Sequence, residues 1–118
     1  MATEPPRNEC CPPSLALLDE AEAARLSALL KVVADPVRLR LLHHIAAAPD
    51  TTACACHLPT ALGISQPTLS HHLKRLTDAG LISREQRGRW AHYRLVRDAM
   101  DHLASAFSGI AGSDPAVG

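Results

Sequence analysis

The hydrophobic positions along the chain recur with helical spacing over most of its length. In residues 14–34, leucine, alanine and valine return every three or four positions, with acids early and Lys31 late, as the helix dipole favours. Asp35 and Pro36 interrupt this segment, and they also supply an N-cap and a first helical residue for the run PVRLRLLHHIAAA. The pattern therefore predicts two consecutive amphipathic helices, the second ending at the sequence PDTT.

A short helix and a longer one are predicted next, with a tight turn between them. The short helix spans about Cys56 to Leu62 and ends at Gly63, because glycine readily takes the left-handed conformation at a helix C-terminus. Ser65 is a suitable N-cap for the longer helix, whose leucines lie on one stripe until Gly80. Two helices joined in this way form a helix-turn-helix unit, whose second helix can enter the major groove of DNA.

The periodicity changes to alternation in LISREQRGRWAHYRL, which predicts a β-hairpin with its turn at Arg87-Gly88. One face of the second strand carries the apolar residues Ala91, Tyr93 and Leu95, and the other carries Trp90, His92 and Arg94. A last amphipathic helix follows in RDAMDHLASAFSGIAG. The predicted fold class is mainly α with a β-hairpin wing, that is, a winged helix-turn-helix.

The composition agrees with a helical fold, since only 3% of the residues are aromatic while leucine and alanine dominate. A chain of 118 residues fits one small domain. Four of the nine prolines fall within residues 1–14, which we expect to form a flexible arm that carries Cys10 and Cys11. The domain itself is expected over residues 15–110, followed by a polar tail over residues 111–118.

The charges balance over the whole chain, with 12 basic and 12 acidic residues, so only their local distribution can indicate a partner. Basic residues outnumber acidic ones between residues 71 and 94, on the second helix of the unit and on the hairpin. A polar helix face beside a basic hairpin tip is typical of DNA binding, whereas the helix pattern alone would also fit a solvated face. The candidate DNA-binding residues are Ser65, Gln66, Thr68, Ser70, His71, Lys74, Arg75, Arg87 and Arg89.

The N-terminal sequence has no apolar core of signal-peptide length, and no apolar run approaches the roughly 18 residues of a membrane span. We therefore expect a cytoplasmic protein with no membrane partner. The reducing conditions of that compartment argue against a disulfide framework for the four cysteines. Metal binding, redox sensing and simple burial remain as explanations for them.

Three stretches, ADPVRLRLL, CACHLPTALGISQPTLSHHLKRLTDAGLI and GRWAHYRL, resemble the ArsR/SmtB family of metal-responsive bacterial repressors, and the resemblance covers residues 15–108. It implies a homodimer, paired through its first and last helices, on double-stranded operator DNA with an inverted repeat. It also implies release of that DNA by an inducer ion. Asp98 and His102 match half of the last-helix site of zinc-type members, but a solvated helix face is the preferred interpretation because the other half is missing.

The resemblance also implies a role for the cysteines. Cys54 and Cys56 match a Cys-x-Cys that arsenic and cadmium members carry at the start of the helix before the recognition helix. Residues i and i+2 diverge on an α-helix, so we expect both thiols to face one ion only if the first turn opens, and ligation then strains the helix. Pro59 stands where many arsenic members have a third cysteine, and the relatives imply that Cys10 or Cys11 of the partner subunit completes the site.

The number of thiols narrows the choice of inducer but does not by itself decide it. As(III) or Sb(III) prefers three sulfurs, whereas four thiolates suit Cd(II), and Pb(II) accepts either arrangement. The sequence context favours the metalloid, with Cd(II) or Pb(II) as the alternative and a disulfide or persulfide signal as another. An enzyme with a redox-active cysteine is disfavoured, because no phosphate-binding or oxyanion loop lies near the thiols. His57 is expected to face solvent.

Overall fold

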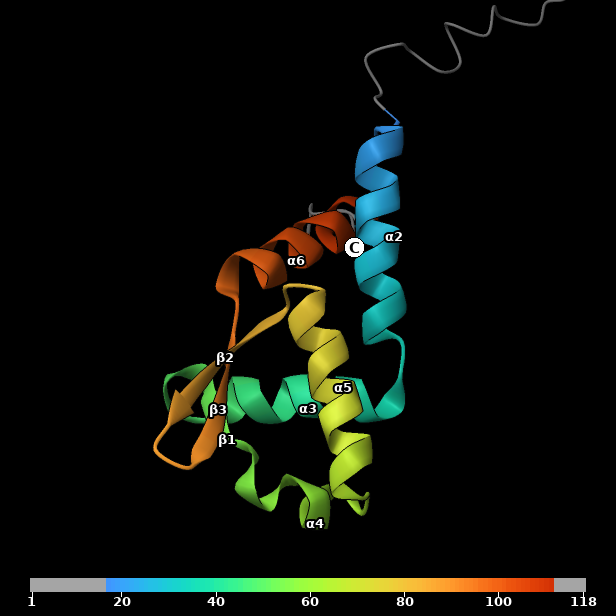
Figure 1. Ribbon diagram of the computed structural model, residues 1–118. Coiled ribbons are helices and arrows are strands. Elements are labelled where there is room, and N and C mark those ends of the chain that lie inside the picture. Colours follow the sequence, from blue (N-terminus) through green and yellow to red (C-terminus); the bar gives the residue numbers. More distant parts are fainter. Residues whose placement is uncertain (1–16, 112–118) are drawn as a thin grey trace, which may run out of the picture.

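The computed structural model describes residues 17–111 and shows a mainly helical fold with a small antiparallel sheet (Figure 1). The helices are α2 (Glu20–Val33), α3 (Pro36–Ala47), α4 (Leu58–Leu62), α5 (Gln66–Asp78) and α6 (Arg97–Ala111). The strands are β1 (Thr52–Cys54), β2 (Ile82–Arg87) and β3 (Trp90–Leu95), and short 3-10 helices span Pro49–Thr51 and Ala55–His57. The predicted fold class is confirmed, while the predicted arm over residues 1–14 lies outside the described residues.

The helix boundaries follow from capping groups that the sequence already displays. Asp35 caps α3, its Oδ2 accepting the backbone N–H groups of Val37 and Arg38 at 3.0 Å each, and Pro36 occupies the first helical position. Asp19 caps α2 in the same way. These side chains satisfy amide groups that have no partner inside the helix, so each helix begins where its aspartate stands.

The core lies between α3, α5 and the sheet. The side chains that are most deeply buried are Leu41, Ile45, Leu69, Leu76, Leu81 and Ile82. The predicted leucine stripe of α5 is confirmed, because Leu69, Leu73 and Leu76 all face this core. Burial of each such side chain contributes about 1.5–3 kcal/mol, so the apolar stripe determines which face of α5 remains outside.

The sheet has three strands in the order β1-β3-β2, all antiparallel, and its edge strand β1 was not predicted. The sequence PDTT was interpreted only as the end of α3. Strand β1 forms because Ala53 pairs with Tyr93 of β3 and both side chains are buried, which is a long-range contact without a local signal. The hairpin turn lies at Gly88 and Arg89, one position later than predicted, since Arg87 pairs with Trp90.

The helices and strands are gathered at two ends of the domain. In Figure 1 the helices α2 and α6 lie side by side at one end, whereas α4, the beginning of α5 and the hairpin tip lie toward the other. None of the helices between residues 17 and 111 is long and apolar enough to cross a membrane. The arrangement separates an apolar end of the molecule from an end that carries the candidate DNA-binding residues.

Candidate DNA-binding surface and cysteine site

Helix α5 presents its polar face to solvent because its leucines face the core. Ser65 is the N-cap: its Oγ accepts the N–H of Thr68 at 3.2 Å and donates to the Thr68 hydroxyl at 2.9 Å. Both residues remain exposed. The other predicted DNA-contacting residues of this helix are exposed as well, namely Gln66, Ser70, His71, Lys74 and Arg75. The structure therefore gathers the predicted residues of α5 on one accessible face.

The neighbouring His72 turns inward and was missed by the sequence reasoning. Only 13% of its side chain is exposed, and its Nδ1 lies 3.1 Å from an Arg38 guanidinium nitrogen and 3.9 Å from Oδ2 of Asp35. Burial lowers the pKa of His72 and outweighs the opposing effect of the Asp35 carboxylate, while the positive charge of Arg38 lowers it further. His72 therefore anchors α5 to the start of α3. The sequence did carry a signal for this burial, because His72 follows Leu69 by three residues and so lies beside the leucine stripe of α5.

The hairpin supplies the second part of the exposed basic surface. Arg87 pairs with Glu85 at 3.0 Å and lowers the pKa of that carboxyl by donating a hydrogen bond to it. Lys74 of α5 pairs with Asp78 at 3.1 Å, while Arg89 is exposed at the turn. Exposed pairs of this kind add little to folding stability, so these cations can exchange their carboxylates for phosphates at small cost.

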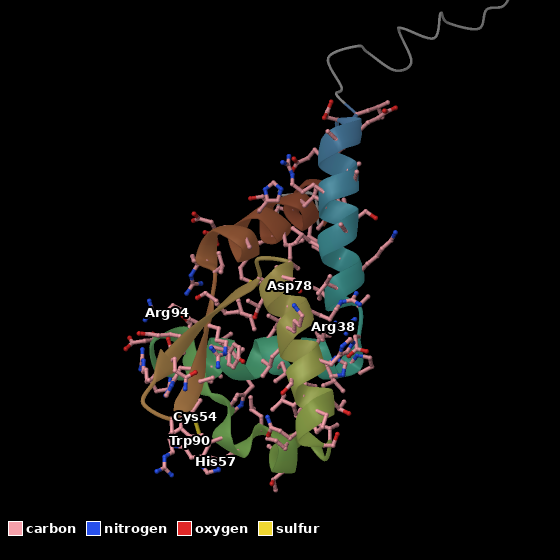
Figure 2. All side chains as sticks on the ribbon, in the orientation of Figure 1. Arg38, Cys54, His57, Asp78, Trp90 and Arg94 are labelled. Atoms are coloured by element: carbon pink, nitrogen blue, oxygen red, sulfur yellow. A yellow bond between two sulfur atoms is a disulfide. The ribbon has the colours of Figure 1, made fainter. Side chains whose placement is uncertain are left out.

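Cys54 and Cys56 lie at the C-terminal end of β1, where a disulfide joins their sulfurs and their Cα atoms are 5.4 Å apart (Figure 2). The Cys54 sulfur also accepts the N–H of Cys56 at 3.2 Å. The expectation that the two thiols diverge on an α-helix is wrong, because Cys54 ends β1 in an extended conformation and Ala55–His57 form a 3-10 turn. Helix α4 begins only at Leu58 instead of near Cys56. The sulfurs therefore converge without opening α4.

The surroundings of this cysteine pair contain few further ligands. A hollow of about 290 Å³ adjoins Cys54 and includes the side chains of His44 and His57, of which His57 is exposed as predicted. Within residues 17–111, no group of three or more His, Cys, Asp or Glu side chains could hold a metal ion. Cys10 and Cys11 lie outside this range. Among the described residues, the site therefore consists of two sulfurs.

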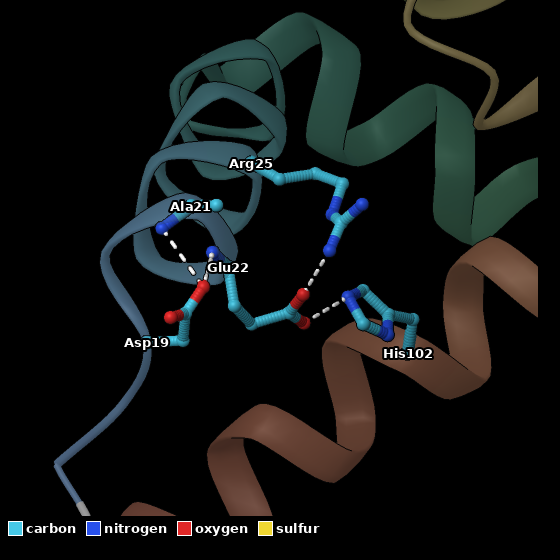
Figure 3. Close-up of polar contacts among 5 residues, drawn as sticks. All are labelled: Asp19, Ala21, Glu22, Arg25 and His102. Carbon is cyan, nitrogen blue, oxygen red and sulfur yellow. Dashed lines mark hydrogen bonds and ion pairs between the residues drawn. The ribbon is translucent and has the colours of Figure 1, made fainter.

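At the other end of the molecule, His102 of α6 contacts α2 (Figure 3). Its Nε2 lies 2.6 Å from Oε2 of Glu22, whose other carboxylate oxygen pairs with Arg25. The hydrogen bond from Arg25 lowers the pKa of Glu22. Asp98 is exposed, as the interpretation of a solvated face predicts, whereas the side chain of His102 is 42% exposed and pairs with Glu22 because α6 packs on α2. The contact joins α6 to α2.

An apolar groove of about 540 Å³ runs beside this contact, between α2 and α6. Its lining includes several large side chains with unusually high exposure: Leu17 at 92%, Leu18 at 58%, Phe107 at 50% and Ile110 at 79%. Isolated exposed apolar residues are ordinary on protein surfaces, but a contiguous patch on two adjacent helices is typical of an interface. This surface is the one that the resemblance assigned to pairing of subunits.

The chain is similar to bacterial regulators along most of its length. Residues 35–84 match the family described as "Bacterial regulatory protein, arsR family". The arsenical resistance operon repressor of Staphylococcus xylosus is 37% identical over 89 residues, which is 75% of this chain and 83% of that protein. The transcriptional repressor SmtB of Mycobacterium tuberculosis is 33% identical over 103 residues, covering 87% of this chain and 70% of that one. The crystal structure of the AntR antimony-specific transcriptional repressor matches with a TM-score of 0.63 and 32% identity, over 87% of this chain and 95% of that chain.

Proposed function

The chain belongs to the arsR family of bacterial regulatory proteins, and from this premise we propose that it is a metalloid-responsive repressor of the cytoplasm. In this proposal the homodimer binds operator DNA and is released when cysteine thiolates bind As(III) or Sb(III). Members of the family regulate transcription, which confirms the expectation that the chain is not an enzyme. The single observation that carries the proposal is the convergence of the Cys54 and Cys56 sulfurs beside the DNA-binding elements.

The DNA-binding part of the proposal rests on α5 and the hairpin. Polar side chains near the start of α5 would read base edges in the major groove, and the arginines of the hairpin would contact phosphates. A homodimer paired through the apolar groove would cover Leu17 and Ile110, and it would present two copies of α5 to one operator. Twofold symmetry of the dimer then requires an inverted repeat with half-sites about one helical turn, or roughly 34–36 Å, apart.

The chemistry of the inducer determines how many thiols are needed. Arsenite has the composition As(OH)₃, and three thiols replace its three hydroxyls to form three As–S bonds with release of three water molecules. The disulfide of Cys54 and Cys56 must first gain two electrons and two protons, for example from a dithiol reductant, before either sulfur can ligate. Two thiols then come from this pair, and we assign the third to Cys10 or Cys11 of the partner subunit.

Two alternatives start from the same pair of sulfurs. Cd(II) or Pb(II) would use Cys54 and Cys56 with both arm cysteines, because four thiolates suit a divalent soft ion. A redox sensor would need no ion, since the observed disulfide is itself a candidate signal. In that case two thiols and one hydrogen peroxide molecule give one disulfide and two water molecules.

The test measures operator binding of the reduced homodimer by fluorescence anisotropy during titration with arsenite, cadmium, lead or hydrogen peroxide. We expect arsenite to release the DNA and to produce As–S absorption with three sulfurs per arsenic. Cys54→Ser and Cys56→Ser should each abolish release while sparing operator binding. Release by peroxide alone, or by cadmium with no response to arsenite, would replace the proposal with the corresponding alternative.

A mixed dimer tests the assignment of the third thiol. One protomer lacks Cys10 and Cys11, and the other lacks Cys54 and Cys56. If ligation crosses the interface, the intact arm of the second protomer meets the intact pair of the first, and one three-sulfur site survives. If ligation stays within a chain, no complete site remains, and loss of three-sulfur binding would refute the cross-subunit assignment.

A further inference from the structure

The cysteine pair and the hairpin are parts of one sheet. Cys54 lies directly opposite His92 in the ladder between β1 and β3, and Thr52 lies opposite Arg94. The Arg94 Nε donates to the Thr52 hydroxyl at 3.1 Å, which adds a side-chain bond between the strands. The 3-10 turn Ala55–His57, which contains Cys56, also contacts β3. The site is therefore attached to the hairpin through β3.

His92 occupies a position that neither the DNA-binding surface nor the apolar core explains. Because side chains alternate along a strand and Tyr93 faces the core, Cys54, His92 and Glu85 form one row across the outer face of the sheet. Directly opposed residues in such a row have Cβ atoms about 4.5–5.5 Å apart. The Nδ1 of His92 is buried and has no hydrogen-bond partner in the described part of the chain. The surroundings of the His92 ring therefore depend on Cys54, which lies opposite it on β1.

The cysteines connect to the hairpin tip through a single strand, whereas their connection to the recognition helix α5 passes through several elements. From His92, two residues of β3 lead to Trp90, which adjoins the turn at Gly88 and Arg89. The route to α5 instead passes through a 3-10 turn, helix α4 and the left-handed turn at Gly63. A paired strand transmits a displacement more directly than a sequence of turns, because its backbone is held by hydrogen bonds on both sides.

Strand β1 is also a weak edge whose pairing can be broken. It has three residues, and without it the sheet would consist of the β2–β3 hairpin alone. A two-stranded hairpin alone is marginally stable in water, so this hairpin depends on its packing against the core and on pairing with β1 as a third strand. A change that withdraws Cys54 from its place opposite His92 therefore loosens the hairpin that carries Arg87 and Arg89.

We propose that the chemical state of the Cys54–Cys56 pair controls the hairpin through the β1–β3 ladder, with His92 and Arg94 as positioning residues. Induction then breaks the bonds between the hairpin and the DNA, while α5 keeps its place in the domain. This inference rests on the proposed function only in taking the cysteine pair as the sensor. It applies to any change at the two sulfurs, whether ligation or disulfide formation.

The first experiment is a thermodynamic cycle on the full-length homodimer. Operator affinity is measured for the reduced and the arsenite-loaded protein in wild type, in Arg87→Ala/Arg89→Ala and in Gln66→Ala/His71→Ala. Allosteric coupling commonly changes affinity about 5–150-fold, and we expect a change in that range for wild type and for the α5 variant. In the hairpin variant the operator affinities of the reduced and the arsenite-loaded protein should differ by no more than about 2-fold. The variant already lacks the two arginines, so arsenite has no hairpin–DNA contacts left to disrupt. Full coupling in the hairpin variant, or its loss in the α5 variant, would overturn the inference.

The second experiment follows the hairpin without DNA. Amide hydrogen exchange should accelerate over residues 82–95 when the cysteines are ligated, while residues 66–78 stay protected. Thr52→Val removes the hydroxyl that accepts the Arg94 hydrogen bond, so it should weaken the coupling between arsenite and operator binding. The number of arsenite molecules bound per subunit should not change. Arsenite binding is followed by the fluorescence of Trp90, the only tryptophan of the chain. Ser83→Ala, across the other side of β3 from Thr52, is the matched control and should retain full coupling. Faster exchange confined to α4 and α5 would contradict the proposed route.

A third arm separates failure of this inference from failure of the proposed function. In a Cys10→Ser/Cys11→Ser background, diamide oxidises only Cys54 and Cys56, and the same cycle compares the dithiol with the disulfide. If arsenite fails to bind the wild-type protein but the disulfide of this variant changes operator affinity through the hairpin, the proposed inducer is wrong and the route stands. If neither ligation nor oxidation changes hairpin exchange or operator affinity, the route is refuted.

Discussion

Replacement of Asp35 by alanine tests how the domain holds its recognition helix. The carboxylate accepts two backbone N–H groups of α3 at 3.0 Å, and it lies 3.9 Å from Nδ1 of His72 on α5. Loss of an N-cap side chain costs about 0.5–2 kcal/mol, and the upper half of that range is expected here because both bonds have ordinary hydrogen-bond length and are partly buried. We therefore expect Asp35→Ala to destabilise the protein by about 1–2 kcal/mol, which lowers Tm by roughly 5–15 °C.

Two variants separate the possible causes of this effect. Asp19→Ala removes the cap of α2, whose two hydrogen bonds are longer, at 3.1 and 3.4 Å, and exposed, so it should cost only about 0.5 kcal/mol. Asp35→Asn retains capping and should remain close to wild type. Unfolding is followed by circular dichroism in urea at a fixed protein concentration, because association of subunits changes apparent stability. Equal losses in Asp19→Ala and Asp35→Ala would refute the argument.

The pH dependence of the same comparison follows from the pKa of Asp35. The hydrogen bond from the backbone N–H of Arg38, together with the charge of the Arg38 side chain, lowers this pKa below the ordinary value of 3.8. A carboxyl whose pKa is lower in the folded state stabilises the protein above its unfolded pKa, and this contribution disappears as pH falls through the folded value. The stability difference between wild type and Asp35→Ala should shrink as pH falls below about 3.8. A difference that grows below pH 3.8 would contradict this assignment.

Three further expectations concern DNA, the inducer and the core. Gln66→Ala should lower operator affinity by about 1–3 kcal/mol and relax base preference, whereas Arg89→Ala should weaken operator and random DNA alike; equal losses on both DNAs in both variants would contradict this division. Arsenite and operator should oppose each other reciprocally by about 1–3 kcal/mol, so unchanged arsenite affinity on saturating operator, measured by calorimetry, would exclude coupling. Leu76→Ala should cost about 2–5 kcal/mol in urea unfolding, because the side chain is fully buried at the centre of the core; a loss under about 1 kcal/mol would show that the site collapses around the smaller residue.

The elements with strong local signals were predicted from the sequence. Asp35 and Pro36 mark the break between α2 and α3, and Ser65 marks the start of α5, because capping and backbone conformation depend on residues only a few positions apart. The alternation in the hairpin likewise reflects which side chains face the core. The exposed polar face of α5 follows from the same periodicity, so the candidate DNA-binding residues of this helix lie where the pattern placed them.

The tertiary structure decided the features that depend on distant residues. Strand β1 exists because Ala53 packs against Tyr93, and its three residues carry no strand signal of their own. The convergence of the Cys54 and Cys56 sulfurs depends on that strand, since a local helix rule alone would have separated them.

The same distinction applies to the histidines. His71 and His72 are adjacent in sequence, yet one faces solvent and the other contacts Asp35 and Arg38. His102 has a partner only because α6 packs on α2. Periodicity and capping act over one or two turns of the chain, so the sequence alone determined the longer helices, the hairpin and their polar faces, but not the start of α4. Only three-dimensional packing decided which thiols, imidazoles and strands meet, because those contacts join segments that no local pattern connects.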